Sequence, residues 1–244
     1  MYKSNTIDNI PSINAPKILK PLYAEKGITE PSPDVKKLAK DHHLIQHQEG
    51  GYFNETDRSS FLMENPSYPG HNDGTKLANV TRTGDFQNEP ILPHPTDSTK
   101  KITPTRNYST LIHYLITCES PLGRLHMNEA RIIHILQKGR GQYVLVYPDG
   151  TIKSFVVGFN TDKGEVNQWV VPGGVYKASF LLPLDSDDQA HESSKDHLLI
   201  SEVVVPGFEY DGHTFARKDD LVKLVGNEKA NELSWLLGGE YFNK

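Results

Sequence analysis

Short apolar runs separated by turn residues fill the middle of the chain, from Leu122 to Pro183. Pro148-Asp149-Gly150 closes one of these runs as a turn, because proline fixes one backbone angle and glycine permits the next. Pro172-Gly173-Gly174 separates two others in the same way. Several short strands with this even punctuation predict an all-β sandwich or barrel. The strands predicted in this stretch are 131–136, 142–147, 151–159, 169–171 and 175–182.

Helical spacing of apolar residues occurs only towards the two ends of the chain. Ser32-Pro33-Asp34 predicts a helix start, with Ser32 as the N-cap and proline at the first helical position. Residues 219–237 carry an apolar stripe that is interrupted near Gly226-Asn227, and this predicts one or two C-terminal helices. Two apolar runs outside the middle stretch predict further strands at 108–117 and 198–205.

The segment 52–58 reads as a strand with polar residues on both faces. Gly50-Gly51 directly before it predicts a sharp bend or a close backbone approach. Strict alternation puts Arg58 on the same face as Tyr52 and opposite Glu55. Such a strand either lines a cavity or forms an exposed edge of a sheet, and both interpretations stay open.

The pattern predicts one domain with two tails. Residues 1–31 form an irregular N-terminal tail that prolines interrupt repeatedly, and 32–238 form the single domain. A segment rich in Pro, Gly, Asn and Asp, at about 63–105, reads as a long inserted surface loop. Residues 239–244 are a C-terminal tail.

The composition says more about where the protein works than about the reaction it performs. A net charge of -5 gives no indication of nucleic-acid binding, and no apolar run is long enough for a membrane span. Residues 1–18 are polar, unlike a secretory signal. The single cysteine, Cys118, excludes an internal disulfide and reads as a small buried hydrophobic side chain. We expect a cytoplasmic protein, with or without access to the nucleus.

Five separate segments carry a resemblance to a known family: 47–59, 109–112, 126–139, 170–175 and 205–208. Together they resemble the cupin superfamily and, within it, the fungal branch of the cupins named for a domain of unknown function (the cupin 5 family). The resemblance covers about 38–237, apart from the inserted loop. It implies a cupin-type (RmlC-like) jelly-roll β-barrel with an N-terminal helix and C-terminal helices, a ligand cavity between two sheets, and a homodimer. The family has no settled activity, so the resemblance names no substrate.

The resemblance also bears on metal binding. Metal-binding cupins hold a transition metal with three histidines and a glutamate from two motifs. Aligned on the glycines of those motifs, this chain has His126 at the first ligand position and Asn128 at the second. Ile132 replaces the glutamate, and Lys177 stands at the fourth position. Isoleucine has no donor atom and a protonated lysine has no free lone pair, so we expect a barrel without metal or other cofactor.

The inward positions that remain form a mixed polar set of His126, Asn128, His134 and Lys177. A lysine on a buried face needs a carboxylate or a ligand anion as partner. Glu202, alone within an apolar run, is the natural candidate. Two other interpretations are equally open: the two charges face outward, or they form an ion pair with a purely structural role. His134 is either a core histidine whose ring nitrogens are hydrogen-bonded or a group that lines the cavity, and both interpretations stay open.

Five further residues are candidates for ligand contact: Tyr143, Glu49, Tyr52, Arg58 and Trp169. Tyr143 could offer its phenol, although aromatic packing is the favoured interpretation. Trp169 is either a cavity wall or part of the core. Glu49, Tyr52 and Arg58 are placed at the rim by the resemblance alone.

Three functions follow from this set. The first is a metal-independent isomerase or epimerase acting on a sugar-like or small carbonyl substrate, with His134 or His126 as the base and Lys177 at the enolate oxygen. No carboxylate is evidently placed to orient either histidine, which counts against it. The alternative is a non-catalytic storage or sensor module that holds a small, anionic or sugar-like ligand. A metal-dependent oxygenase comes third, and would need a substitute ligand set such as His126, His134 and Glu202.

Overall fold

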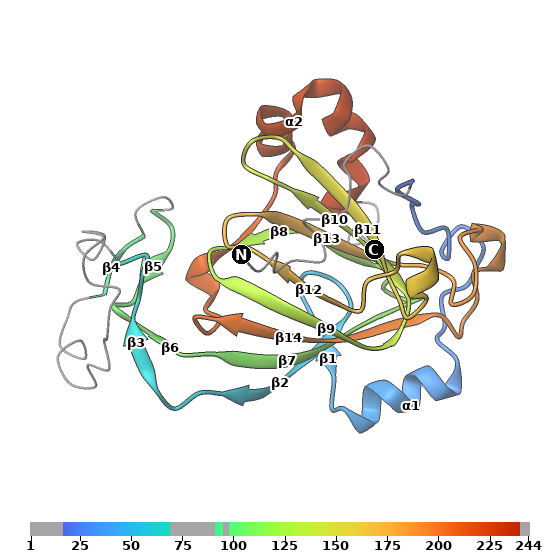
Figure 1. Ribbon diagram of the computed structural model, residues 1–244, viewed down its shortest axis with the longest axis horizontal. Coiled ribbons are helices and arrows are strands. Elements are labelled where there is room, and N and C mark those ends of the chain that lie inside the picture. The colour runs from blue at the N-terminus through green and yellow to red at the C-terminus, as the bar shows by residue number, and fades with distance from the viewer. Residues whose placement is uncertain (1–16, 69–90, 95–97, 240–244) are drawn as a thin grey trace.

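Two antiparallel β-sheets face each other and form the body of the protein (Figure 1). The computed structural model describes residues 17–68, 91–94 and 98–239. The larger sheet has the order β1-β2-β7-β14-β9-β12, and the smaller has the order β11-β10-β13-β8-β15. The larger sheet contains β1 (Ile45–Gln46), β2 (Tyr52–Arg58), β7 (Thr110–Thr117), β14 (His197–Val205), β9 (Arg131–Gly139) and β12 (Gln168–Val171). The smaller contains β11 (Ile152–Val157), β10 (Gly141–Val146), β13 (Tyr176–Leu181), β8 (Leu122–Asn128) and β15 (His213–Phe215). The predicted all-β fold of jelly-roll type is confirmed.

Strand alternation sorts the apolar side chains into two cores. Between the sheets lie side chains such as Tyr114, Trp169 and Ile200. On the outer face of the smaller sheet, residues such as Val144 and Phe180 pack against the C-terminal helices. Each fully buried large side chain contributes roughly 1.5–3 kcal/mol, so these two layers supply most of the driving force for folding. Cys118 belongs to the inner core, and burial raises its pKa to about 11.

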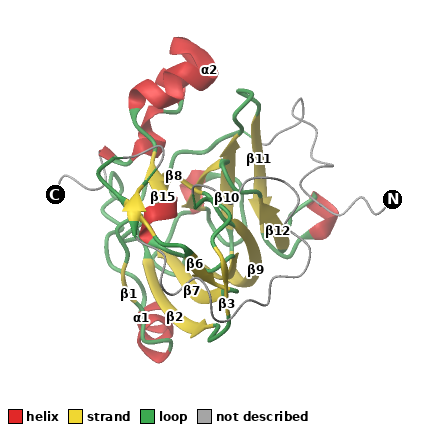
Figure 2. Cartoon of the chain, turned by 90° about the vertical axis from the view of Figure 1, so that its left-hand side faces the viewer, coloured by secondary structure: helices red, strands yellow, loops and turns green. Residues whose placement is uncertain are grey.

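The helices lie on opposite outer sides of the two sheets, as Figure 2 shows. Helix α1 (Pro33–Asp41) begins directly after Ser32, as predicted, although the Ser32 side chain makes no capping hydrogen bond. Helix α2 (Lys218–Glu232) and the 3-10 helix η7 (Ser234–Leu237) form the C-terminal pair. The predicted interruption is confirmed at Gly226, whose φ of 79° is not helical. No helix among the described residues could span a bilayer by length and apolarity.

The N-terminal tail is irregular where it is described, yet it is fastened to the body. Tyr23 is completely buried, and its hydroxyl donates to Asp196 Oδ2 at 2.9 Å. The backbone N–H of Leu22 donates to Glu192 Oε1 at 2.8 Å. Residues 17–31 therefore belong to the folded unit.

The predicted inserted loop contains regular structure that the composition does not reveal. Strands β3 (Leu62–Glu64) and β6 (Thr105–Asn107) pair with each other, and so do β4 (Leu92–Pro93) and β5 (Lys101–Ile102). The prediction of an irregular segment over 63–105 is wrong for these parts, because backbone pairing closes the stem of the insertion. Two- and three-residue strands are too short to show a period of alternation. Most of the remaining loop, 69–90 and 95–97, lies outside the described residues.

A tight turn joins β1 to β2 and carries Glu49. Gly50 and Gly51 have φ of +97° and +68°, values that favour glycine. A Cβ at Gly51 would lie 2.6 Å from the carbonyl oxygen of Leu115. The hydroxyl of Tyr114 donates to the carbonyl oxygen of Gly50 at 2.8 Å, and this contact ties the turn to β7.

Tyr114→Phe is expected to lower the free energy of unfolding by about 1–2 kcal/mol, because it leaves the buried Gly50 carbonyl without its donor. Urea denaturation followed by fluorescence measures the loss. Tyr176→Phe, at a half-buried position in the smaller sheet, is the matched control and should change the value by less than about 0.5 kcal/mol. Equal effects in the two variants would contradict this role for the Tyr114 hydroxyl.

Candidate functional site

A cavity of about 110 Å³ opens against the inner face of the larger sheet. Sites for drug-sized ligands usually enclose about 300–1,000 Å³, so this cavity suits a small ligand. Its apolar wall consists of Phe53, Ile112, Ile132, Val204 and Phe208. Its polar lining consists of His47, Glu49, Glu55, Arg58, Tyr114, Asn128, Glu202, Glu209 and Tyr210.

A β-bulge in β2 decides which of its side chains reach this cavity. The register with β7 shifts between Glu55 and Asp57, so Arg58 returns to the inward face. There Arg58 Nε donates to Glu55 Oε1 at 2.8 Å, and its Nη1 donates to Glu209 Oε1 at 2.8 Å. The prediction that Arg58 shares a face with Tyr52 is therefore wrong. Tyr52 points away from the cavity, and its hydroxyl donates to Glu119.

Lys177 lies at the centre of a buried polar network. Its Nζ donates to Glu202 Oε2 at 2.8 Å and to His134 Nε2 at 3.0 Å. Glu202 and His134 face each other across the β14–β9 pairing, and Lys177 reaches them from β13 in the opposite sheet. The sequence leaves open whether Lys177 and Glu202 meet, and in the structure they form an ion pair with side chains 4% and 9% exposed.

His134 is neutral in this network. Lysine can only donate, so His134 Nε2 accepts and its proton resides on Nδ1. Burial and then the charge of Lys177 lower the pKa of His134 well below 6.5. The side chain is fully buried, so Glu202 rather than His134 forms part of the cavity wall.

Two of the candidate aromatic residues lie behind this network. The ring of Trp169 stacks on His134 with centroids 5.0 Å apart and an interplanar angle of 8°. Tyr143 meets the edges of both rings, with centroids 5.6 Å from His134 and 4.8 Å from Trp169. Both residues are 1% exposed, so they pack in the core and fix the position of His134.

A second polar cluster joins the β1–β2 turn to the smaller sheet. Glu49 Oε1 accepts a hydrogen bond from His213 Nε2 at 2.7 Å, and His126 Nε2 lies 3.3 Å from the same oxygen. His126 is on β8 and His213 on β15, and the pairing of these strands brings the imidazoles together. Sequence reasoning missed His213, because it stands in a three-residue strand outside the resembling segments. The two clusters place carboxylates beside His134 and His126, where the sequence showed none.

Burial sets the protonation of the second cluster. It lowers the pKa of His126 from 6.5 to about 3, against the attraction of Glu49 and with the help of Lys177. Burial alone would raise the pKa of Glu49, but the hydrogen bond from His213 and the surrounding imidazoles lower it overall. At neutral pH the cluster therefore combines an anionic carboxylate with a neutral His126.

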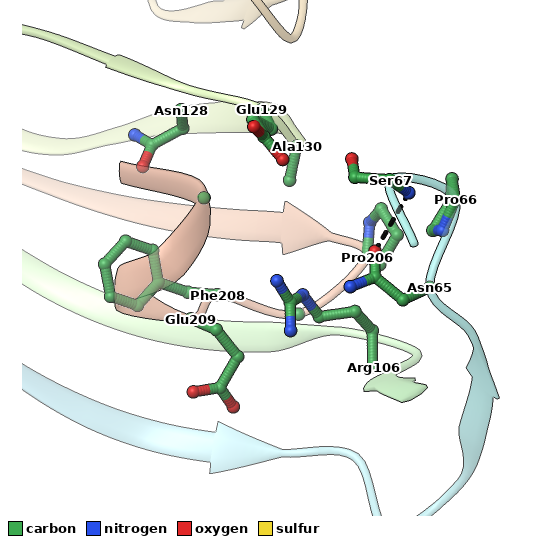
Figure 3. A pocket seen from close by; sticks show the side chains of 12 residues that line it. Asn65, Pro66, Ser67, Arg106, Asn128, Glu129, Ala130, Pro206, Phe208 and Glu209 are labelled. Carbon is green, nitrogen blue, oxygen red and sulfur yellow. Dashed lines mark hydrogen bonds between the residues drawn. The ribbon is translucent and has the colours of Figure 1, made fainter. Parts of the chain in front are cut away.

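Asn128 lies where the main cavity meets a smaller one of about 60 Å³. Figure 3 shows the smaller cavity with Asn128 and Phe208 on one side and Asn65 and Pro66 on the other. The side-chain oxygen of Asn128 is buried and has no hydrogen-bond partner among the described residues. This oxygen can therefore accept a hydrogen bond from a ligand.

The four positions that the resemblance assigns to a cupin metal do not fit one. Ile132 is part of the apolar wall and has no donor atom. Lys177 Nζ is engaged by Glu202 and His134. His126 alone keeps an imidazole suited to a metal, so this structure supports no reaction step through the family's metal position.

Comparisons with known proteins agree with this architecture. A family model described as "Cupin superfamily (DUF985)" matches residues 36–216. The uncharacterized protein YML079W of Saccharomyces cerevisiae is 50% identical over 215 residues, which are 88% of this chain and 91% of the yeast protein. A hypothetical protein from Leishmania major superposes with a TM-score of 0.56 at 22% identity, covering 78% of this chain and 91% of that one. Protein SO0799 from Shewanella oneidensis gives a TM-score of 0.55 at 17% identity, covering 82% and 95%.

Proposed function

This chain belongs to the DUF985 family of the cupin superfamily, as its resemblance predicted, and we propose that it is an isomerase or epimerase that moves a proton on a small sugar-like or carbonyl substrate. The observation that carries the proposal is the position of Glu202. Its carboxylate forms part of the cavity wall, and Lys177 holds it from behind. The chemistry needs no metal, because a carboxylate base and hydrogen-bond donors suffice.

The substrate carbonyl and its neighbouring C–H bond occupy the cavity beside Glu202. Glu202 takes the proton from carbon, and the electron pair of that bond moves onto the carbonyl oxygen to form an enolate. The Asn128 amide, which lines the same cavity, donates a hydrogen bond to the developing oxyanion. Glu202 then delivers this proton to the former carbonyl carbon, while the proton of the neighbouring hydroxyl moves to the former carbonyl oxygen, so that an aldose and a ketose interconvert. Lys177 and His134 keep the carboxylate of Glu202 in one orientation throughout.

The charges around the cavity favour a neutral substrate. Lys177 is paired with Glu202, and Arg58 with Glu55 and Glu209, so these two cations already have anionic partners. The expectation of an anionic ligand at Lys177 therefore loses its physical reason, and a sugar-like ligand is the better match.

Glu202→Gln is expected to slow solvent deuterium incorporation by at least about 100-fold, because an amide cannot act as the base. The wild-type protein and the variant are incubated with a panel of aldoses and ketoses in D₂O, and NMR follows deuterium at the substrate carbons. Glu119→Gln, an exposed position outside the cavity, is the matched control and keeps the wild-type rate. Circular dichroism confirms that each variant is folded. Saturable binding without exchange in the wild type would reject the isomerase and leave the non-catalytic binding module.

A further inference from the structure

We propose that Glu49, His126 and His213 form a binding site for a divalent transition metal ion. Each side chain offers one ligand atom, and these atoms all lie within 4.8 Å of one another. Two imidazole nitrogens and one carboxylate oxygen form the type of set that binds Fe²⁺, Co²⁺ or Zn²⁺ in proteins. Of the four motif positions that hold the metal in metal-binding cupins, only His126 takes part, so this site differs from theirs.

The orientation of His126 is the main argument. Its Nδ1 lies 2.7 Å from the carbonyl oxygen of Arg124, which can only accept, so Nδ1 carries the ring proton. In the neutral ring, Nε2 then holds a lone pair. That lone pair is buried, makes no hydrogen bond within the described residues, and faces Glu49 Oε1 at 3.3 Å. Two buried acceptors in contact cost on the order of 1–3 kcal/mol, and a cation between them removes this cost.

The surroundings of His126 match those of a metal ligand. Metal-bound histidines usually donate their other ring N–H to a carbonyl or carboxylate, which fixes the ring and directs its lone pair. The contact between Nδ1 and the Arg124 carbonyl does this here. All three side chains are less than 12% exposed, so the ion would be shielded from bulk water.

The spacing requires only a small adjustment. Ligand atoms that are each about 2.0–2.2 Å from one metal lie roughly 3–3.5 Å from each other. Glu49 Oε1 lies 2.7 Å from His213 Nε2 and 3.3 Å from His126 Nε2. His213 Nε2 now donates its proton to Glu49, so this proton must leave when the nitrogen binds the ion. Metal binding therefore releases about one proton per ion. The carboxylate of Glu49 then balances one of the two positive charges of the bound ion.

This inference goes beyond the proposed function, because Glu202, Lys177 and His134 are not among the three ligands. The test uses the untagged, EDTA-treated full chain and CoCl₂ alone. Visible absorption is expected to show Co²⁺ ligand-field bands that saturate at about one ion per chain. Calorimetry in buffers of different ionisation enthalpy should show the release of about one proton.

His213→Gln and Glu49→Gln are each expected to weaken Co²⁺ binding by at least about 100-fold. The matched control His191→Gln, at an exposed histidine, should bind as the wild type does. Failure of the wild type to take up Co²⁺, or undiminished binding in both ligand variants, overturns the proposal. Because the wild-type titration is itself decisive, the test survives if a variant fails to fold. The result is also separate from the deuterium-exchange test, since no substrate is present.

Discussion

Lys177→Met is expected to lower the free energy of unfolding by about 3–5 kcal/mol, because it leaves the carboxylate of Glu202 buried without its cation. The ion pair is 2.8 Å long, with both side chains almost fully shielded from water. His134 Nε2 loses its donor in the same variant, which adds a second unsatisfied group. Urea denaturation at pH 7 in the presence of EDTA measures the loss.

The double variant Lys177→Met/Glu202→Leu separates the ion pair from the packing around it. Removing both charges takes away the desolvation cost, so the double variant should regain most of the stability that Lys177→Met loses. Lys138→Met, at an exposed lysine of β9, is the matched control and should stay within about 0.5 kcal/mol of the wild type. A loss below about 1 kcal/mol in Lys177→Met would mean that Glu202 finds another way to neutralise or hydrate its charge.

Local pattern was enough to single out these two charged residues in the sequence, although their contact stayed open. Lys177 and Glu202 each stand alone in an apolar run, and a buried charge requires a partner of opposite sign. The strands that hold them were predictable for the same reason, since alternation and turn residues are properties of neighbouring positions. The break at Gly226 also follows from one residue's backbone preference.

The second cluster was not accessible, because it depends on pairing between distant segments. His213 reaches His126 only through the β15–β8 ladder, and Glu49 reaches both from a turn at the start of the domain. Arg58 was assigned to the wrong face because one bulged residue reverses the alternation beyond it. A single sequence holds no signal for a register shift of this kind, whereas the backbone geometry shows it directly.

The protein is expected to lose stability steeply on acidification, and His126 alone should account for about 3 kcal/mol between pH 7 and pH 4. Burial lowers the pKa of its imidazole from 6.5 to about 3 in the folded state. Between these two values the unfolded chain binds a proton that the folded chain excludes. Stability from this group is therefore complete above pH 6.5 and disappears progressively as the pH falls towards 3.

Glu49 and His134 act in the same direction. The pKa of Glu49 is lowered in the folded state, although burial opposes this, so its contribution is lost as the pH falls below its ordinary value of 4.5. The pKa of His134 is lowered mainly by burial, which again favours the unfolded chain in acid. The whole-protein slope should therefore exceed that of His126 alone.

Urea denaturation at pH 7, 6, 5 and 4 in EDTA measures this dependence without a contribution from bound metal. The His126→Gln variant should lose about 3 kcal/mol less than the wild type over the same interval, whatever its stability at pH 7. His191→Gln, whose imidazole is exposed, should retain the wild-type slope. Parallel curves for the wild type and His126→Gln would show that the imidazole of His126 titrates normally in the fold. In that event it would be protonated beside Glu49 in mild acid, and the lone pair that the metal site requires would be available only at higher pH.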